Sequence, residues 1–82
     1  MPERLEAAFD NIGGLKLRAP VKAAGVVVGR VERIYFDPKT YQAVVRMMIS
    51  SNVALPVDTH AKIVSESLLG GMVVVLEPGG DK

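Results

Sequence analysis

Cysteine and tryptophan are absent from the 82 residues, and His60 is the only histidine. Without cysteine there is no disulfide framework, no thiolate metal site and no cysteine nucleophile. The absence of cysteine does not distinguish an oxidising compartment from a reducing one. No pair of carboxylates lies at ligand spacing around His60, so a metal site is not expected. These absences exclude the disulfide-stabilised and metal-stabilised classes of small domain.

The chain also lacks an excess of charge and a long apolar run. Ten Lys and Arg residues stand against nine Asp and Glu residues, and the two signs are mixed from end to end. A polyanionic partner is therefore not expected. No apolar run approaches the roughly 20 residues that cross a bilayer as a helix, and the first ten residues lack the features of a signal peptide.

Motifs for catalysis are missing as well. Asp58, His60 and either Ser65 or Ser67 supply the residue types of a hydrolase triad, but no G-x-S-x-G turn surrounds either serine. The G-x-G-x-x-G fingerprint and the Gly-Lys-Ser/Thr phosphate loop do not occur. We expect a protein that is not an enzyme, with no cofactor, no metal and a solvated histidine at a strand edge.

What the sequence does contain is β-patterning. Apolar residues make up 49% of the chain, and valine and isoleucine alternate with polar residues in short runs. The sequence predicts one all-β domain over residues 1–82, a small closed antiparallel β-barrel of six or seven short strands, because closure removes exposed strand edges. The expected strands are residues 4–10, 19–25, 26–36, 43–49, 60–64 and 72–76, with one helical turn possible within 50–59.

Four glycines are expected to serve the backbone, namely Gly13, Gly14, Gly25 and Gly29. The first two form a turn, since glycine reaches positive φ without steric cost. Along residues 26–36, Val31 has the opposite parity to Ile34 and Phe36, so one face cannot hold all three without a bulge or bend. Gly29 lies just before that break and predicts a corner of the barrel.

The stretch SESLLGGMVVVL places Leu68 and Leu69 before two glycines and an entirely apolar strand. Two interpretations are open: the leucines enter the core at a tight turn, or the loop exposes them to an apolar ligand or partner. Neighbouring residues of an extended chain point to opposite sides, so one leucine can pack inward while the other projects. The apolar run 72–76 predicts burial on both faces or against a neighbouring chain.

A nucleic-acid-binding alternative rests on the segment AGVVVGRVERIYF. Its pattern, a glycine followed by alternating valines, is typical of small SH3-like RNA-binding barrels. Phosphate contacts would come from Arg18, Arg30, Arg33, Lys39 and Arg46. Two Phe and two Tyr provide few platforms for base stacking, and the net charge is only +1. We therefore expect no nucleic-acid partner.

Four segments in order, FDNIGGL, AGVVVGRV, DPKTY and LLG, closely resemble the MCE domain family from about Leu5 to Gly79. The resemblance implies a compact β-barrel that assembles as a hexameric ring in the periplasm. It also implies a tether to the bacterial inner membrane through an upstream helix, and a C-terminal helical segment, both outside this sequence. The implied partners are phospholipid and the permease and ATPase subunits of an ABC-type transporter that moves lipid between the inner and outer membranes.

The same resemblance implies the site. The loop 67–71 would project toward the ring axis and line a hydrophobic pore, with Leu68 and Leu69 in contact with lipid. Ser67, Gly70 and Gly71 would form the turn that lets the loop protrude. A purely structural oligomerisation module, which would form a ring without binding lipid, stays open as a further alternative.

Overall fold

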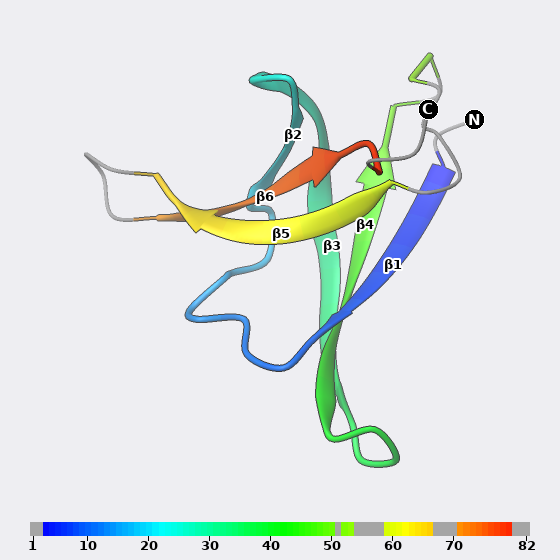
Figure 1. Ribbon diagram of the computed structural model, residues 1–82, viewed down its shortest axis with the longest axis vertical. Helices are drawn as coiled ribbons and strands as arrows, with labels where there is room; N and C mark the ends of the chain where they lie inside the picture. Colours follow the sequence, from blue (N-terminus) through cyan, green and yellow to red (C-terminus); the bar gives the residue numbers. More distant parts are fainter. Residues whose placement is uncertain (1–2, 51, 54–58, 67–70, 80–82) are drawn as a thin grey trace.

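The computed structural model describes residues 3–50, 52–53, 59–66 and 71–79, which form one six-stranded β-sheet curled into an open half-barrel (Figure 1). The all-β prediction is confirmed, and each described strand agrees with an expected one to within a few residues. The strands are β1 (Glu3–Phe9), β2 (Pro20–Ala23), β3 (Val26–Asp37), β4 (Gln42–Ile49), β5 (His60–Ser65) and β6 (Met72–Glu77). The turn predicted within 50–59 falls largely outside the described residues.

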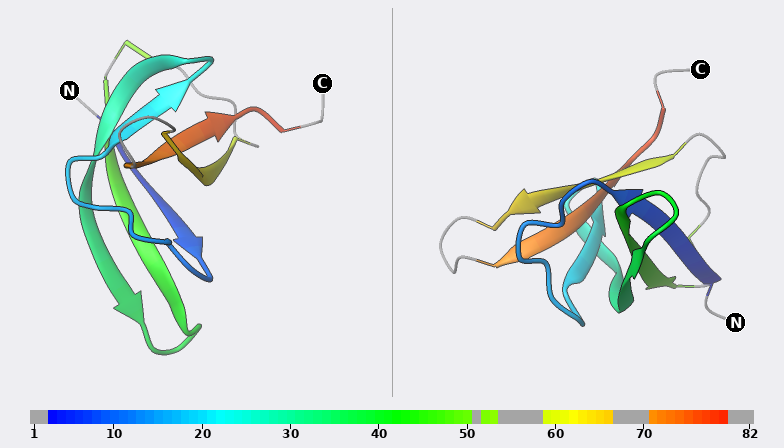
Figure 2. Two further views of the ribbon diagram at one scale, coloured as in Figure 1. Left: turned by 90° about the vertical axis from the view of Figure 1, so that its left-hand side faces the viewer. Right: turned by 90° about the horizontal axis from the view of Figure 1, so that it is seen from below.

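The prediction of a closed, antiparallel barrel is wrong on both points. The strand order is β1-β4-β3-β2-β6-β5, so β1 and β5 form the two edges of the described sheet, and they do not pair with each other (Figures 1 and 2). The pair β2–β6 is parallel, whereas the other four pairs are antiparallel. Both edge strands carry charged side chains, among them Arg4, Glu6 and Lys62, which discourage unwanted edge pairing.

The bulge predicted in the long strand is present in β3. The register with β4 shifts between Val31 and Arg33, which brings Val31 and Ile34 to the core side despite their opposite parity. Phe36 does not join them and is 55% exposed near the end of the hairpin. The bulge therefore allows two of the three apolar residues, Val31 and Ile34, to face the core.

Gly29 lies where two backbones come close together. A Cβ atom at this position would overlap the carbonyl oxygen of Met48 and would lie 2.9 Å from Cδ1 of Ile49. Gly25 has φ +81° and follows Ala24 at φ +53°, so the β2–β3 turn has the two positive φ values of a type I′ hairpin. Gly29 therefore permits a close approach of β3 to β4, not the barrel corner that was expected, and Gly25 forms the turn between β2 and β3.

The core lies on the concave side of the half-barrel. Val45, Met47 and Ile49 of β4 are at most 2% exposed and share the face that their alternation predicts. Val74 of β6 belongs to this core, while Val73, only 3% exposed, has the opposite parity. The apolar strand β6 is thus buried on both faces within one chain.

Strand β5 alternates as expected. Ala61 and Ile63 pack against the core from partly buried positions, whereas His60 and Lys62 are exposed. The strand therefore covers the core with one face and presents its polar side chains to solvent.

Replacing Gly29 with alanine should lower the free energy of unfolding by about 2–3 kcal/mol, because the new methyl group has no space beside the backbone of β4. Urea denaturation followed by circular dichroism measures this change. Gly71→Ala is the matched control, since a Cβ atom there meets no atom of the described residues within 4 Å. A loss of stability at Gly71 equal to that at Gly29 would contradict the packing argument.

Candidate functional site

The β5–β6 hairpin places the predicted leucine loop at the end of the sheet. Ser65 and Met72 form the last strand pair, and beyond them the amide of Glu66 donates a hydrogen bond to the carbonyl oxygen of Gly71 at 2.7 Å. We call these four residues the hairpin neck. Residues 67–70 follow directly from it and lie outside the described residues, so the roles predicted for Ser67, Leu68, Leu69 and Gly70 remain predictions.

The last residue of the predicted loop, Gly71, is described. It is exposed. Its carbonyl group is fixed by the hydrogen bond from Glu66. Gly71 therefore directly precedes β6, and its predicted part in the turn remains a prediction.

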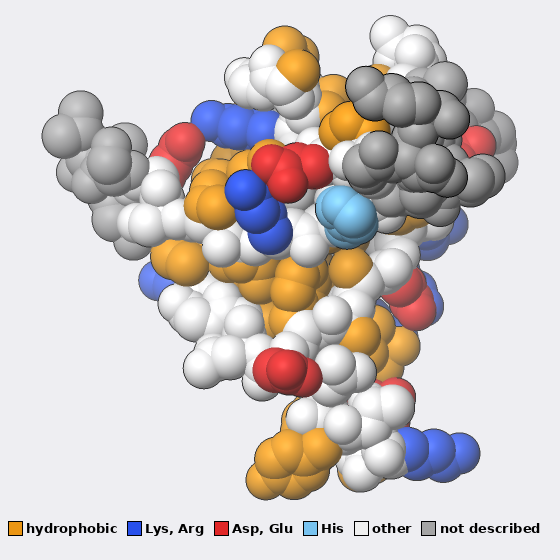
Figure 3. Space-filling model, in the orientation of Figure 1, with side chains coloured by type: hydrophobic (Ala, Val, Ile, Leu, Met, Phe, Trp, Pro, Cys, Tyr) orange, Lys and Arg blue, Asp and Glu red, His pale blue; other side chains and the backbone are white. Residues whose placement is uncertain are grey.

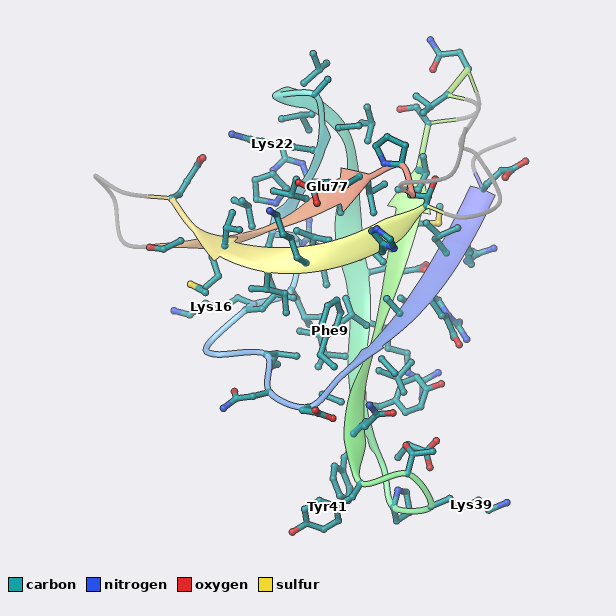
Figure 4. All side chains as sticks on the ribbon, in the orientation of Figure 1. Phe9, Lys16, Lys22, Lys39, Tyr41 and Glu77 are labelled. Atoms are coloured by element: carbon teal, nitrogen blue, oxygen red, sulfur yellow. The ribbon has the colours of Figure 1, made fainter. Side chains whose placement is uncertain are left out.

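An ion pair attaches the hairpin neck to the neighbouring strand. Nζ of Lys22 on β2 lies 2.9 Å from Oε2 of Glu66, and the side chain of Lys22 is only 24% exposed. Lys22 stands opposite Val75 in the parallel pairing, so the ion pair spans the outer face of β6. The neck is thus held by one backbone hydrogen bond and one partly shielded ion pair (Lys22 is labelled in Figure 4).

A second ion pair belongs to the same hairpin. Nζ of Lys62 on β5 lies 3.0 Å from Oε2 of Glu77 on β6, and both side chains are about half exposed. Glu77 is the last residue of β6, so this pair lies toward the opposite end of the hairpin from the neck. The Lys62–Glu77 pair can therefore serve as a control for the Lys22–Glu66 pair at the neck.

The loop between β1 and β2 lies against the base of the hairpin. Gly13 and Gly14 have φ values of +62° and +96°, which confirms the predicted turn, and Asn11 Oδ1 accepts a hydrogen bond from the amide of Gly13 at 2.8 Å. A Cβ atom on Gly13 would lie 3.6 Å from Cε of Met72, and Leu15 is buried in the core. Gly13 and Met72, far apart in the sequence, therefore meet at the start of β6.

Three contributions to the site were missed by sequence reasoning: Asn11, the Lys22–Glu66 ion pair and the contact of Met72. The Asn-x-Gly spacing is a usable signal for the Asn11 turn, because an asparagine side chain commonly caps the backbone two residues on. The ion pair has no such signal. It depends on the parallel pairing of β2 with β6, which alternation within either strand does not reveal.

Most of the basic residues of the nucleic-acid alternative have partners within the chain. Arg46 is paired with Glu6 at 3.0 Å, and Arg33 lies over the ring of Tyr35 at 5.0 Å. Lys39 is at the far end of the β3–β4 hairpin (Figure 4). Arg33 and Arg46 stand opposite each other in the pairing of β3 with β4, and the guanidinium group of each already has a partner within the chain.

Arg30 is engaged as well, since its Nη1 lies 3.4 Å from the carbonyl oxygen of Arg18. Charged side chains of both signs are interspersed with apolar ones on the face in Figure 3. In the described part of the chain, no three His, Asp or Glu side chains gather as a metal site, and no helix is long and apolar enough to cross a membrane.

The comparisons with known proteins agree with the fold. The family model described as MlaD protein matches residues 2–79. The chain is 43% identical over 76 residues to "Intermembrane phospholipid transport system binding protein MlaD" of Haemophilus influenzae, and 46% identical over 76 residues to the protein of that name of Escherichia coli. Each alignment covers 92% of this chain but 46% and 42% of the respective relative, so the chain spans less than half the length of these relatives.

A solved structure shows the same fold. A chain of "Acinetobacter MlaFEDB complex in ATP-bound Vtrans1 conformation" superposes with a TM-score of 0.85 at 22% identity, covering 96% of this chain and 66% of that one. The matches to MlaD proteins confirm the resemblance to MCE domains that the sequence shows, and they narrow it to one group within that family. From the match over residues 2–79 and the two relatives above 40% identity, this chain belongs to the MlaD protein family.

Proposed function

We propose that this chain is the lipid-binding domain of an ABC-type phospholipid transport system and has no catalytic role of its own. The observation that carries the proposal is the hairpin neck, in which the Glu66–Gly71 hydrogen bond and the Lys22–Glu66 ion pair hold the ends of a leucine-containing loop beyond the last strand pair. The names of the relatives support phospholipid as the ligand. Leu68 and Leu69 are the proposed contacts with acyl chains.

The energy of lipid transfer explains why such a loop must be repeated around a pore. Moving roughly thirty acyl methylenes through water at about 0.8 kcal/mol each costs on the order of 20 kcal/mol. Two leucines from one chain do not offset that cost. A hexameric ring, built from one repeated head-to-tail interface, turns a two-residue contact into a continuous apolar lining, with the loops at its axis.

The proposed setting is the one that the resemblance to MCE domains implies. The ring faces the periplasm, is anchored to the bacterial inner membrane, and works with permease and ATPase subunits that supply the energy for moving phospholipid between the two membranes. The complex named in the structural neighbour supports such partners. The comparisons give no support to the nucleic-acid-binding barrel or to the purely structural oligomerisation module.

Leu69→Asp should abolish phospholipid transport and leave the fold intact, because a carboxylate in the pore lining opposes the passage of acyl chains. Transfer of a fluorescent phospholipid between proteoliposomes, with the full-length protein and its partner subunits, measures transport, and circular dichroism measures the fold. Leu17→Asp is the matched control, since Leu17 is a 60% exposed leucine outside the loop. An unfolded Leu69→Asp protein would show that this leucine belongs to the core.

Reversing the charge at the hairpin neck should also impair transport. Glu66→Lys places two cations side by side, which repels β2 from the neck, and the double variant Lys22→Glu/Glu66→Lys should restore transport. The stability change should stay within about 1 kcal/mol, as for other solvent-accessible ion pairs. The same reversal at Lys62 and Glu77 serves as the control and should leave transport unchanged. Equal losses at both pairs would refute a specific role for the neck.

A further inference from the structure

The tip of the β3–β4 hairpin, residues 36–41, exposes two aromatic rings. Phe36 is 55% exposed and Tyr41 is 80% exposed, and they are two of the five large apolar side chains exposed among the described residues. Their ring centroids are 5.1 Å apart with the planes at 85°, an edge-to-face pair. The two rings therefore form one apolar unit at the surface.

Hydrogen bonds within the turn fix the backbone that carries the two rings. The amide of Tyr41 donates a hydrogen bond to the carbonyl oxygen of Asp37 at 2.8 Å, and the amide of Lys39 donates one to Asp37 Oδ1 at 2.9 Å. Tyr41 has φ +60°, a region that glycine and asparagine occupy readily and aromatic residues rarely do. The tip thus keeps a bulky exposed ring at a position whose backbone favours a small residue, which points to a role for the ring outside the fold.

The tip carries one carboxylate, that of Asp37, and one ammonium group, that of Lys39. The carboxylate of Asp37 is engaged by the amide of Lys39, whereas the ammonium group of Lys39 forms no ion pair with any described residue. Figure 4 shows Lys39 and Tyr41 together at the far end of the hairpin. The surface offered by the tip is therefore two aromatic rings beside the ammonium group of Lys39, which is not paired with the nearby Asp37 carboxylate.

The narrow, projecting shape of the tip indicates the kind of surface that it can contact. The hairpin projects beyond the other strands at the lower end of Figure 1, and a hydrophobic group and a basic side chain stand at that end in Figure 3. A narrow convex tip can enter a soft surface without a matching pocket. Tyrosine and lysine are also the side chains that partition into the interfacial region of a bilayer, where the ring is apolar at one end and hydrated at the other.

We propose that the β3–β4 hairpin tip inserts Phe36 and Tyr41 into the interfacial region of a phospholipid bilayer, with Lys39 in contact with anionic headgroups. This contact is with the surface of a membrane, not with single lipid molecules during transfer. It rests on residues 36–41 and does not depend on the leucine loop. A basic residue near an anionic surface adds to the binding, so the contact should be stronger on anionic bilayers.

The absence of tryptophan from the chain makes a direct test available. Tyr41→Trp introduces a sole indole in the turn at the tip, and Tyr35→Trp introduces one in β3, where Tyr35 is paired with Val44 within the sheet and points to the opposite side from Phe36. Each variant is mixed with vesicles of phosphatidylcholine, with or without phosphatidylglycerol, and with vesicles of brominated lipid. The indole emission of the Tyr41→Trp variant should shift to shorter wavelength and be quenched by the brominated chains, and that of the Tyr35→Trp variant should change in neither respect.

Two further variants in the Tyr41→Trp background sharpen the test. Lys39→Gln should weaken partitioning onto phosphatidylglycerol vesicles about fivefold and leave binding to phosphatidylcholine alone unchanged. Leu69→Asp should leave the indole signal at the tip intact, so a failure of this proposal can be told from a failure of the leucine loop.

Three results would overturn the proposal. The first is an indole emission in Tyr41→Trp that does not respond to vesicles, or quenching that is equal in Tyr41→Trp and Tyr35→Trp. The second is loss of the signal when Leu69→Asp is added, which would assign the membrane contact to the loop. The third is a shift of the Tyr41→Trp emission with protein concentration in the absence of vesicles, which would identify a second copy of the chain as the occupant.

Discussion

The parallel pairing of β2 with β6 is the contact on which the arrangement of this domain depends. Strands β1, β4 and β3 form one antiparallel group, and β5 and β6 form a separate hairpin that joins the sheet only beside β2. Three residue pairs make this junction, and Val21 and Val74, which face each other in it, are both fully buried. Without the junction, the hairpin and its loop would have no strand partner among the described residues.

The same junction connects the core to the proposed lipid contact. It brings Lys22 within reach of Glu66 and sets the start of β6 beside the turn at Gly13. The loop therefore extends from a base that is fixed by burial on one side and by an ion pair on the other. In the proposed ring, such a fixed base would set the leucines of each copy at the same depth.

Local patterns predicted the strands of this domain well, and long-range pairing escaped them. Alternation along β4 identified the buried face of Val45 and Met47, and the break in alternation after Gly29 identified the bulge, since both are properties of one strand. The closed barrel was a wrong prediction because closure requires β1 and β5 to meet, and neither strand carries information about the other. The pattern left two interpretations of the leucine pair open, and the family resemblance favoured the lipid contact.

The central claim is that Leu69 contacts phospholipid in the assembled transporter. The most direct measurement places a photo-crosslinking residue at Leu69 of the full-length protein in cells, with Leu17 as the exposed control, and detects labelled phospholipid on the purified protein. We expect lipid to be captured at Leu69 and not at Leu17. A folded, abundant protein that captures no lipid at Leu69 would contradict the account.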